Sequence, residues 1–129
     1  MQASTRFLDT SALPVARVRD LPLTMAQVDQ WLADMEILMR AEQAFVLLYE
    51  RLPGPDDRGD PEGRRKSVLW LKAHREDFGV HCRGMVLMCE DVSALQPMLA
   101  PLEKAYRVPA RAAATADEAQ AHVQQLMAA

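Results

Sequence analysis

Two short, uninterrupted apolar runs constrain the fold of this chain more than any other feature of its sequence. Residues 44–49 read Ala-Phe-Val-Leu-Leu-Tyr, and residues 84–89 read Gly-Met-Val-Leu-Met-Cys. Runs of this kind are typical of strands that are buried on both faces of a sheet. Both are far shorter than the ~20 apolar residues that cross a bilayer. They predict the two central strands of a sheet and no membrane span.

The segment before the first run predicts an amphipathic helix. Thr24 and Gln27 form a capping box, in which each side chain accepts a hydrogen bond from the backbone of the other residue. The apolar residues behind this box recur at intervals of three and four, which places them on one face of a helix. They are Val28, Trp31, Leu32, Met35, Leu38 and Met39.

A second helix is predicted over residues 64–78, between the two apolar runs. Val68 and Phe78 lie on one side of it, at helical spacing. Gly79 is suited to a left-handed cap at its C-terminal end. The residues before it, 52–63, are rich in proline, glycine and acidic residues and predict a loop.

A third helix is predicted after the second run. Ser93 and Gln96 form another capping box at its start. Pro97 and Pro101 should kink or split this helix, because proline has no N–H to donate and clashes with the preceding turn.

The remaining segments complete an alternating order. Residues 15–19 alternate apolar and basic side chains, as a half-exposed strand does, and residues 108–114 predict an alanine-rich strand. Thr115 and Glu118 form a third capping box before a last helix. The predicted order is β-α-β-α-β-α-β-α, which indicates an α/β fold with helices packed on a largely parallel, four-stranded sheet.

This order predicts one layered domain over residues 14–129. Residues 1–13 are expected to form a loose lead-in, from which Phe7 and Leu8 could dock on the domain. A chain of 129 residues has the length of one ordinary domain.

Charge and cysteine usage bear on partners and location. The 15 basic and 18 acidic residues give a net charge of −3, without the basic excess of a general nucleic-acid binder, so no nucleic-acid partner is expected. Cys82 and Cys89 lie seven residues apart on one predicted strand, roughly 20 Å at ~3.3 Å per residue, and cannot pair with each other. Free thiols and the absence of a recognisable secretory signal predict a cytoplasmic location.

Three segments carry a resemblance to a known family. They are the apolar strand of residues 45–49 with its acidic loop, the segment from helix 64–72 to strand 82–87, and the C-terminal helix of residues 115–126. Together they resemble the STAS-like domains, which are similar to bacterial anti-sigma-factor antagonists and to a lipid-binding α/β fold. The resemblance implies a STAS-like topology and a non-catalytic regulatory module of bacterial type, with a homodimer as one arrangement.

One departure from this family concerns its phosphorylation switch. Anti-sigma-factor antagonists carry an Asp-Ser-Ser/Thr-Gly-like turn at the start of the second helix. Here residues 59–67 read Gly-Asp-Pro-Glu-Gly-Arg-Arg-Lys-Ser, and no such turn is present. The resemblance therefore implies an interaction module without the phosphorylatable turn.

The predicted partner-binding surface is the loop of residues 52–63 with the first turn of the second helix. Its charged residues are Asp56, Asp57, Arg58, Asp60, Arg64, Arg65 and Lys66. The loop follows a central strand, and ligands of α/β sheets sit beyond the carboxyl ends of strands. Cations at a helix N-terminus are disfavoured by the helix dipole, so they either bind an anionic partner or neutralise the acidic loop. Both interpretations stay open.

The alternative hypothesis is a small apolar molecule or lipid held in a pocket between helix and sheet. Its expected lining is Trp31, Met35, Trp70 and Met98. A retained ligand would raise the thermal midpoint, whereas a protein-interaction module would have an empty core.

No metal, cofactor or catalytic activity is predicted. His74, His81 and Cys82 are residue types that bind transition metals, but their spacing is not that of a known ligand pair. His81 and Cys82 are neighbours on a predicted strand and should face apart, which excludes a nucleophile and base between them. We therefore expect a protein that is not an enzyme.

Overall fold

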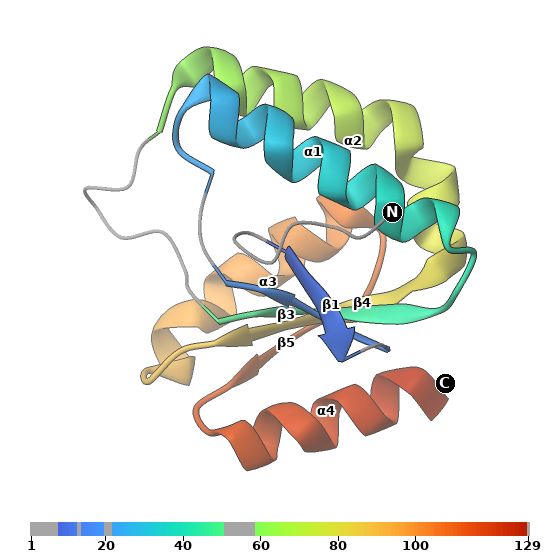
Figure 1. Ribbon diagram of the computed structural model, residues 1–129. Coiled ribbons are helices and arrows are strands. Elements are labelled where there is room, and N and C mark those ends of the chain that lie inside the picture. The colour runs from blue at the N-terminus through green and yellow to red at the C-terminus, as the bar shows by residue number, and fades with distance from the viewer. Residues whose placement is uncertain (1–7, 13, 20–21, 51–58, 129) are drawn as a thin grey trace.

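Five strands form one mixed sheet, in which the order in space is the order along the chain, β1-β2-β3-β4-β5 (Figure 1). The structure is a computed structural model that describes residues 8–12, 14–19, 22–50 and 59–128, with only the backbone of residues 10–12. The strands are β1 (Leu8–Ala12), β2 (Val15–Val18), β3 (Phe45–Tyr49), β4 (Cys82–Met88) and β5 (Ala110–Ala113). β1 pairs antiparallel with β2, and the other three pairs are parallel.

Four helices cover the two faces of the sheet unequally. They are α1 (Met25–Arg40), α2 (Pro61–His81), α3 (Val92–Tyr106) and α4 (Ala116–Ala128). The first three connect consecutive parallel strands that are added in one direction, and right-handed crossovers then place every connecting helix on the same face. α1, α2 and α3 share one core with that face, and α4 alone packs on the other (Figure 1).

Side chains alternate between the two faces of each central strand, and this alternation explains how both faces become buried. Phe45 and Leu47 of β3 point toward α1, α2 and α3, whereas Val46 and Leu48 point toward α4. β3 and β4 are both interior strands, which confirms the prediction made from the two apolar runs. The α/β class with helices packed on a sheet is also confirmed.

The prediction of four strands and a loose lead-in is wrong, because residues 8–12 form β1. This segment, Leu-Asp-Thr-Ser-Ala, has little apolar alternation, and only its pairing with β2 makes it a strand. Leu8 is fully buried, as its expected docking requires, and Phe7 lies outside the described residues. The observed order therefore begins β-β-α and not β-α.

The capping boxes of the first and last helices are confirmed in their main contacts. The Thr24 hydroxyl accepts from the Gln27 backbone N–H at 3.2 Å, and the Gln27 side chain accepts from the Thr24 N–H at 3.2 Å. At α4 the Thr115 hydroxyl accepts from the Glu118 N–H at 3.2 Å, while the Glu118 carboxylate reaches one residue further, to the Ala114 N–H. Local hydrogen bonding therefore sets both helix starts.

The bounds of α2 differ from those predicted. The helix begins at Pro61, where the Asp60 carboxylate accepts from the Glu62 N–H at 2.8 Å, and it continues through Gly79 to His81. Gly79 is therefore not a left-handed cap. The helix ends because Cys82 is extended and joins β4 directly, so strand pairing and not a glycine sets its end.

α3 departs from the prediction at its cap, and of the two expected effects of its prolines, a kink or a split, the split does not occur. Its cap is Asp91, whose carboxylate accepts from the Ala94 N–H at 3.2 Å, and not Ser93. The helix is not split, since it continues through Pro97 and Pro101 to Tyr106. Both prolines are exposed, so water can satisfy the carbonyls that lose a backbone partner.

Candidate functional site

The outward side of α2 carries apolar and basic residues together. Only Gly63 and Phe78 are buried in this long helix. Val68 is 52% and Leu69 is 56% exposed. We call Arg64, Arg65, Val68, Leu69 and Lys72 the α2 outer face, because spacings of three and four residues bring them to one side of a helix.

The exposure of Val68 contradicts its predicted place on the buried side of the helix. α2 packs through a narrow strip on its other side, where Trp70 Nε1 donates to Glu36 Oε1 at 3.2 Å and the Phe78 ring meets Phe45 edge-on at 6.1 Å. Val68 and Leu69 are adjacent and lie four residues after two arginines. That placement beside two arginines indicates an exposed apolar pair, whereas helical periodicity alone puts Val68 on the same side as Phe78.

The predicted basic residues divide into two groups. Lys66 forms an ion pair with Asp29 of α1, so it fastens the two helices together. In the described part of the chain, Arg64, Arg65 and Lys72 form no ion pair with an acidic side chain. Asp60 and Glu62 therefore form no ion pair with Arg64 or Arg65, while Asp56, Asp57 and Arg58 lie outside the described residues.

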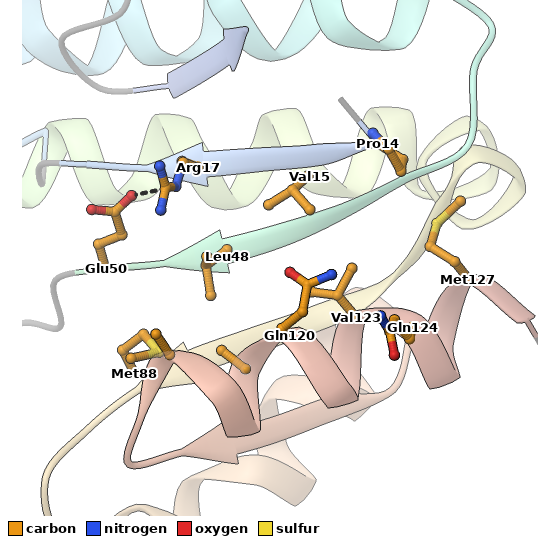
Figure 2. Close-up of a pocket in the computed structure, with 12 residues that line it drawn as sticks. Pro14, Val15, Arg17, Leu48, Glu50, Met88, Gln120, Val123, Gln124 and Met127 are labelled. Atoms are coloured by element: carbon orange, nitrogen blue, oxygen red, sulfur yellow. Dashed lines mark ion pairs between the residues drawn. The ribbon is translucent and has the colours of Figure 1, made fainter. Parts of the chain in front are cut away.

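A groove opens on the opposite face of the sheet, beside α4 (Figure 2). It has a volume of about 760 Å³. Its apolar walls come from β2, β3, β4 and α4, and its main apolar residues are Val15, Leu48, Met88, Val123 and Met127. We call this feature the α4 groove. It exists because α4 packs over β3, β4 and β5 and leaves β2 beside it partly uncovered.

An ion pair stands at one end of the α4 groove. Arg17 Nε lies 2.9 Å from Glu50 Oε1, and both side chains are partly exposed (Figure 2). The parallel register places Arg17 level with Leu48, and Glu50 follows β3 two residues later. Arg17 is therefore the nearer of the two to the centre of the groove.

The four residues of the predicted ligand pocket do not line the α4 groove. Met35 is buried in the core under α1, α2 and α3, and Trp31 and Trp70 pack against that core. Met98 is 50% exposed on α3. Trp31, Met35 and Trp70 therefore lie on the face of the sheet opposite the α4 groove, and helical periodicity alone does not tell which face a helix covers.

The two histidines lie together and apart from Cys82. His74 stacks on Trp70 with ring centroids 4.4 Å apart, and His74 and His81 both line a polar groove between α1 and α2. The Cys82 thiol is buried and donates to the Gly84 carbonyl at 3.4 Å. Among the residues that the structure describes, no three His, Cys, Asp or Glu side chains are placed to hold a metal ion.

The chemistry of Cys82 follows from its burial. Burial raises the pKa of this thiol from 9.0 to about 12, so it stays protonated near neutral pH. Tyr49 and Tyr106 pack, partly buried, against the same core, and burial raises the pKa of both phenols as well. This cluster is a set of protonated core groups.

Comparisons of the chain with protein-family models, with curated proteins and with solved structures found no match. No helix within the described ranges is both long and apolar enough to cross a membrane. The α2 outer face and the α4 groove are the two surfaces whose chemistry bears on function.

Proposed function

We propose that this protein is a non-catalytic regulatory or protein-interaction module that binds a protein partner through the α2 outer face. The observation that carries the proposal is the exposure of Val68 and Leu69, two adjacent apolar side chains that remain more than half accessible. Apolar residues surrounded by charges are typical of interaction surfaces, where the apolar contact supplies affinity and the charges supply orientation.

The charges define the chemistry of the partner. Three cations surround the apolar pair, and they are Arg64, Arg65 and Lys72. A complementary partner presents acidic side chains around an apolar contact. A second copy of this chain would bring like charges together at the same face, so the charge pattern favours a different protein over a homodimer.

The packing of α2 supports the same role. The ion pair between Lys66 and Asp29 and the hydrogen bond between Trp70 and Glu36 both hold α2 on α1. The outer face is therefore presented on a fixed helix, which reduces the entropy lost on binding. A regulatory role of this kind is also what the resemblance to STAS-like domains implies.

The test compares a variant of the α2 outer face with a variant at another exposed apolar residue of the same helix. The immobilised protein is used to capture proteins from an extract of its host, and each captured protein is then measured against purified variants. We expect Leu69→Ser with Arg65→Glu to abolish binding and Val80→Ser, which alters another exposed apolar residue of α2, to preserve it. We also expect binding to weaken as salt rises.

The proposal fails if every captured protein binds the Leu69→Ser, Arg65→Glu variant as tightly as it binds the unaltered chain. It also fails if Val80→Ser lowers binding by the same factor. Unchanged thermal midpoints for the variants show that a loss of binding is not a loss of folding.

A further inference from the structure

We propose that the α4 groove binds a small amphipathic carboxylate, a molecule with one carboxylate and an extended apolar chain. Arg17 holds the carboxylate, and the chain lies along Val15, Leu48 and Val123 toward Met127 (Figure 2). This site is separate from the α2 outer face, because the two lie on opposite faces of the sheet. The two proposals can therefore stand or fall independently.

The size and wall chemistry of the groove suit a small apolar molecule. Its volume of about 760 Å³ falls within the roughly 300–1,000 Å³ of small-molecule sites. Leu48 and Val123 are buried at its base, and Met88 and Met127 bring flexible thioether side chains that adapt to a ligand. Ordered apolar walls of this kind bind by removing apolar surface from water.

The shape of the groove favours a ligand with an extended alkyl chain over a ligand with a compact ring. The lining stretch of α4 runs from Ala116 to Met127, roughly 16 Å at the ~1.5 Å rise per residue of a helix. Figure 2 shows the strands β2 and β3 along one side of this stretch and α4 along the other. An extended alkyl chain fits a long space between a helix and two strands.

The charged residues of the groove indicate where the polar end of the ligand lies. Among the described residues that line the groove, Arg17 and Glu50 are the only charged ones, and they stand together at one end. The rest of the lining is apolar except for the neutral amides of Gln120 and Gln124. The matching ligand has one charged end and an uncharged remainder.

The geometry of the ion pair indicates that the charged end of the ligand is negative. The contact to Glu50 uses Arg17 Nε, so the terminal nitrogens remain available for a carboxylate, which a guanidinium binds with two parallel hydrogen bonds. Arg17 lies level with Leu48, whereas Glu50 lies further out. The side chains of the pair are 49% and 36% exposed, and an exposed pair of this kind contributes little to stability, so a ligand carboxylate that disturbs the pair does so at little cost.

The experiment uses the full chain and three probes that share a ten-carbon alkyl chain: decanoate and decyltrimethylammonium below their micelle concentrations, and decanol below its solubility limit. Binding is measured by isothermal titration calorimetry, and the site is located by backbone amide shifts in NMR spectra. We expect decanoate to bind more tightly than decanol, decyltrimethylammonium to bind least, and the largest shifts to occur at Val15, Leu48, Val123 and Met127.

Two matched pairs of variants test the two parts of the site separately. One pair tests the contact to the ligand carboxylate, and the other tests the space for its alkyl chain. Arg17→Gln should weaken decanoate binding by roughly ten- to a hundredfold, because a charge-assisted contact is lost. Arg19→Gln removes a similar exposed cation, paired with Asp9 and away from the groove lining, and should leave binding unchanged. Gln124→Trp should fill the groove and abolish binding, whereas Gln125→Trp, at an exposed neighbour outside the lining, should not.

Four outcomes would overturn the inference. The first is that the unaltered protein does not bind decanoate at any concentration below the micelle concentration of decanoate, a result that needs no variant to fold. The second is binding whose amide shifts lie outside the α4 groove. The third is equal affinity for decanoate and decyltrimethylammonium, and the fourth is an equal effect of Arg17→Gln and Arg19→Gln. None of these outcomes bears on partner binding by the α2 outer face.

Discussion

Glu103 of α3 and Arg111 of β5 together cover one end of the exposed edge of the sheet. Glu103 Oε2 accepts from the Ala110 N–H at 3.2 Å, and Arg111 Nη1 donates to the Ala110 carbonyl at 3.2 Å while lying 3.9 Å from Glu103. The carbonyls of Pro109 and Ala113 accept from β4, so Ala110 points its backbone groups outward. An uncovered edge strand is a template for another strand, and these two side chains occupy that place.

Removing this cover should increase self-association. We expect Glu103→Ala with Arg111→Ala to form dimers or larger species as protein concentration rises, because the N–H and carbonyl of Ala110 become available for strand pairing. Sedimentation velocity at several concentrations measures the effect. Lys104→Ala, at an exposed position of the same helix, is the control, and an identical sedimentation profile for all three proteins would contradict the prediction.

Two substitutions at the start of α3 distinguish the observed cap, Asp91, from Ser93, the cap that the sequence predicts. Asp91→Ala should lower the free energy of unfolding by ~1 kcal/mol, because the Ala94 N–H loses its acceptor. Ser93→Ala should change it by less than ~0.5 kcal/mol, as for an ordinary surface substitution. Urea denaturation measures both values. Equal effects, or a larger effect at Ser93, would show that the helix begins elsewhere.

Two glycines should respond to alanine in opposite directions. Gly84 has a φ of 156°, and a Cβ there would lie 2.9 Å from the Leu126 side chain and from the Pro109 carbonyl. Gly84→Ala should therefore destabilise the protein by about 2 kcal/mol, as overpacking does. Gly79 is helical with open space around it, so Gly79→Ala should stabilise by up to ~1 kcal/mol. Thermal denaturation gives both signs, and a destabilising Gly79→Ala would show that α2 ends before Gly79.

The buried Cys82 thiol should make stability depend on alkaline pH. Burial raises its pKa from 9.0 to about 12, so the folded protein holds this proton more tightly than the unfolded chain does. The contribution is complete below pH 9 and is lost as pH rises from there toward about 12. Tyr49 and Tyr106, whose pKa values burial also raises, act in the same direction.

Cys82→Ala should therefore flatten the fall in unfolding free energy between pH 9 and pH 11, where the thiol of the unfolded chain ionises. Cys89→Ala is the control, since Cys89 lies beyond β4 and is only partly buried. Urea denaturation across this pH range measures the slopes. Parallel slopes for the unaltered chain and Cys82→Ala would contradict the assigned burial effect.

Local patterns were enough to predict the type of most elements. The spacing of Val28, Leu32 and Met35 predicts α1 because only a helix brings those residues to one face. The continuous runs predict β3 and β4 because such strands need cover on both sides. Thr24 and Thr115 cap their helices through partners only a few residues away, so these starts are visible in the sequence.

Contacts between distant segments decided the rest. β1 has a weak strand pattern and forms by pairing with β2, and α2 continues past Gly79 until pairing of β4 begins. Arg64 and Arg65, which the sequence predicts at a partner-binding surface, are exposed, but the exposure of Val68 and Leu69 depends on the narrow packing strip of α2.

The α4 groove had no signal in the sequence at all. Its walls come from β2, β3, β4 and α4, which are far apart along the chain. The sequence by itself determined which segments become helices and strands, because that depends on spacing within a segment. The tertiary structure decided that three helices share one face and that α4 covers the other alone, because this depends on strand order and crossover hand.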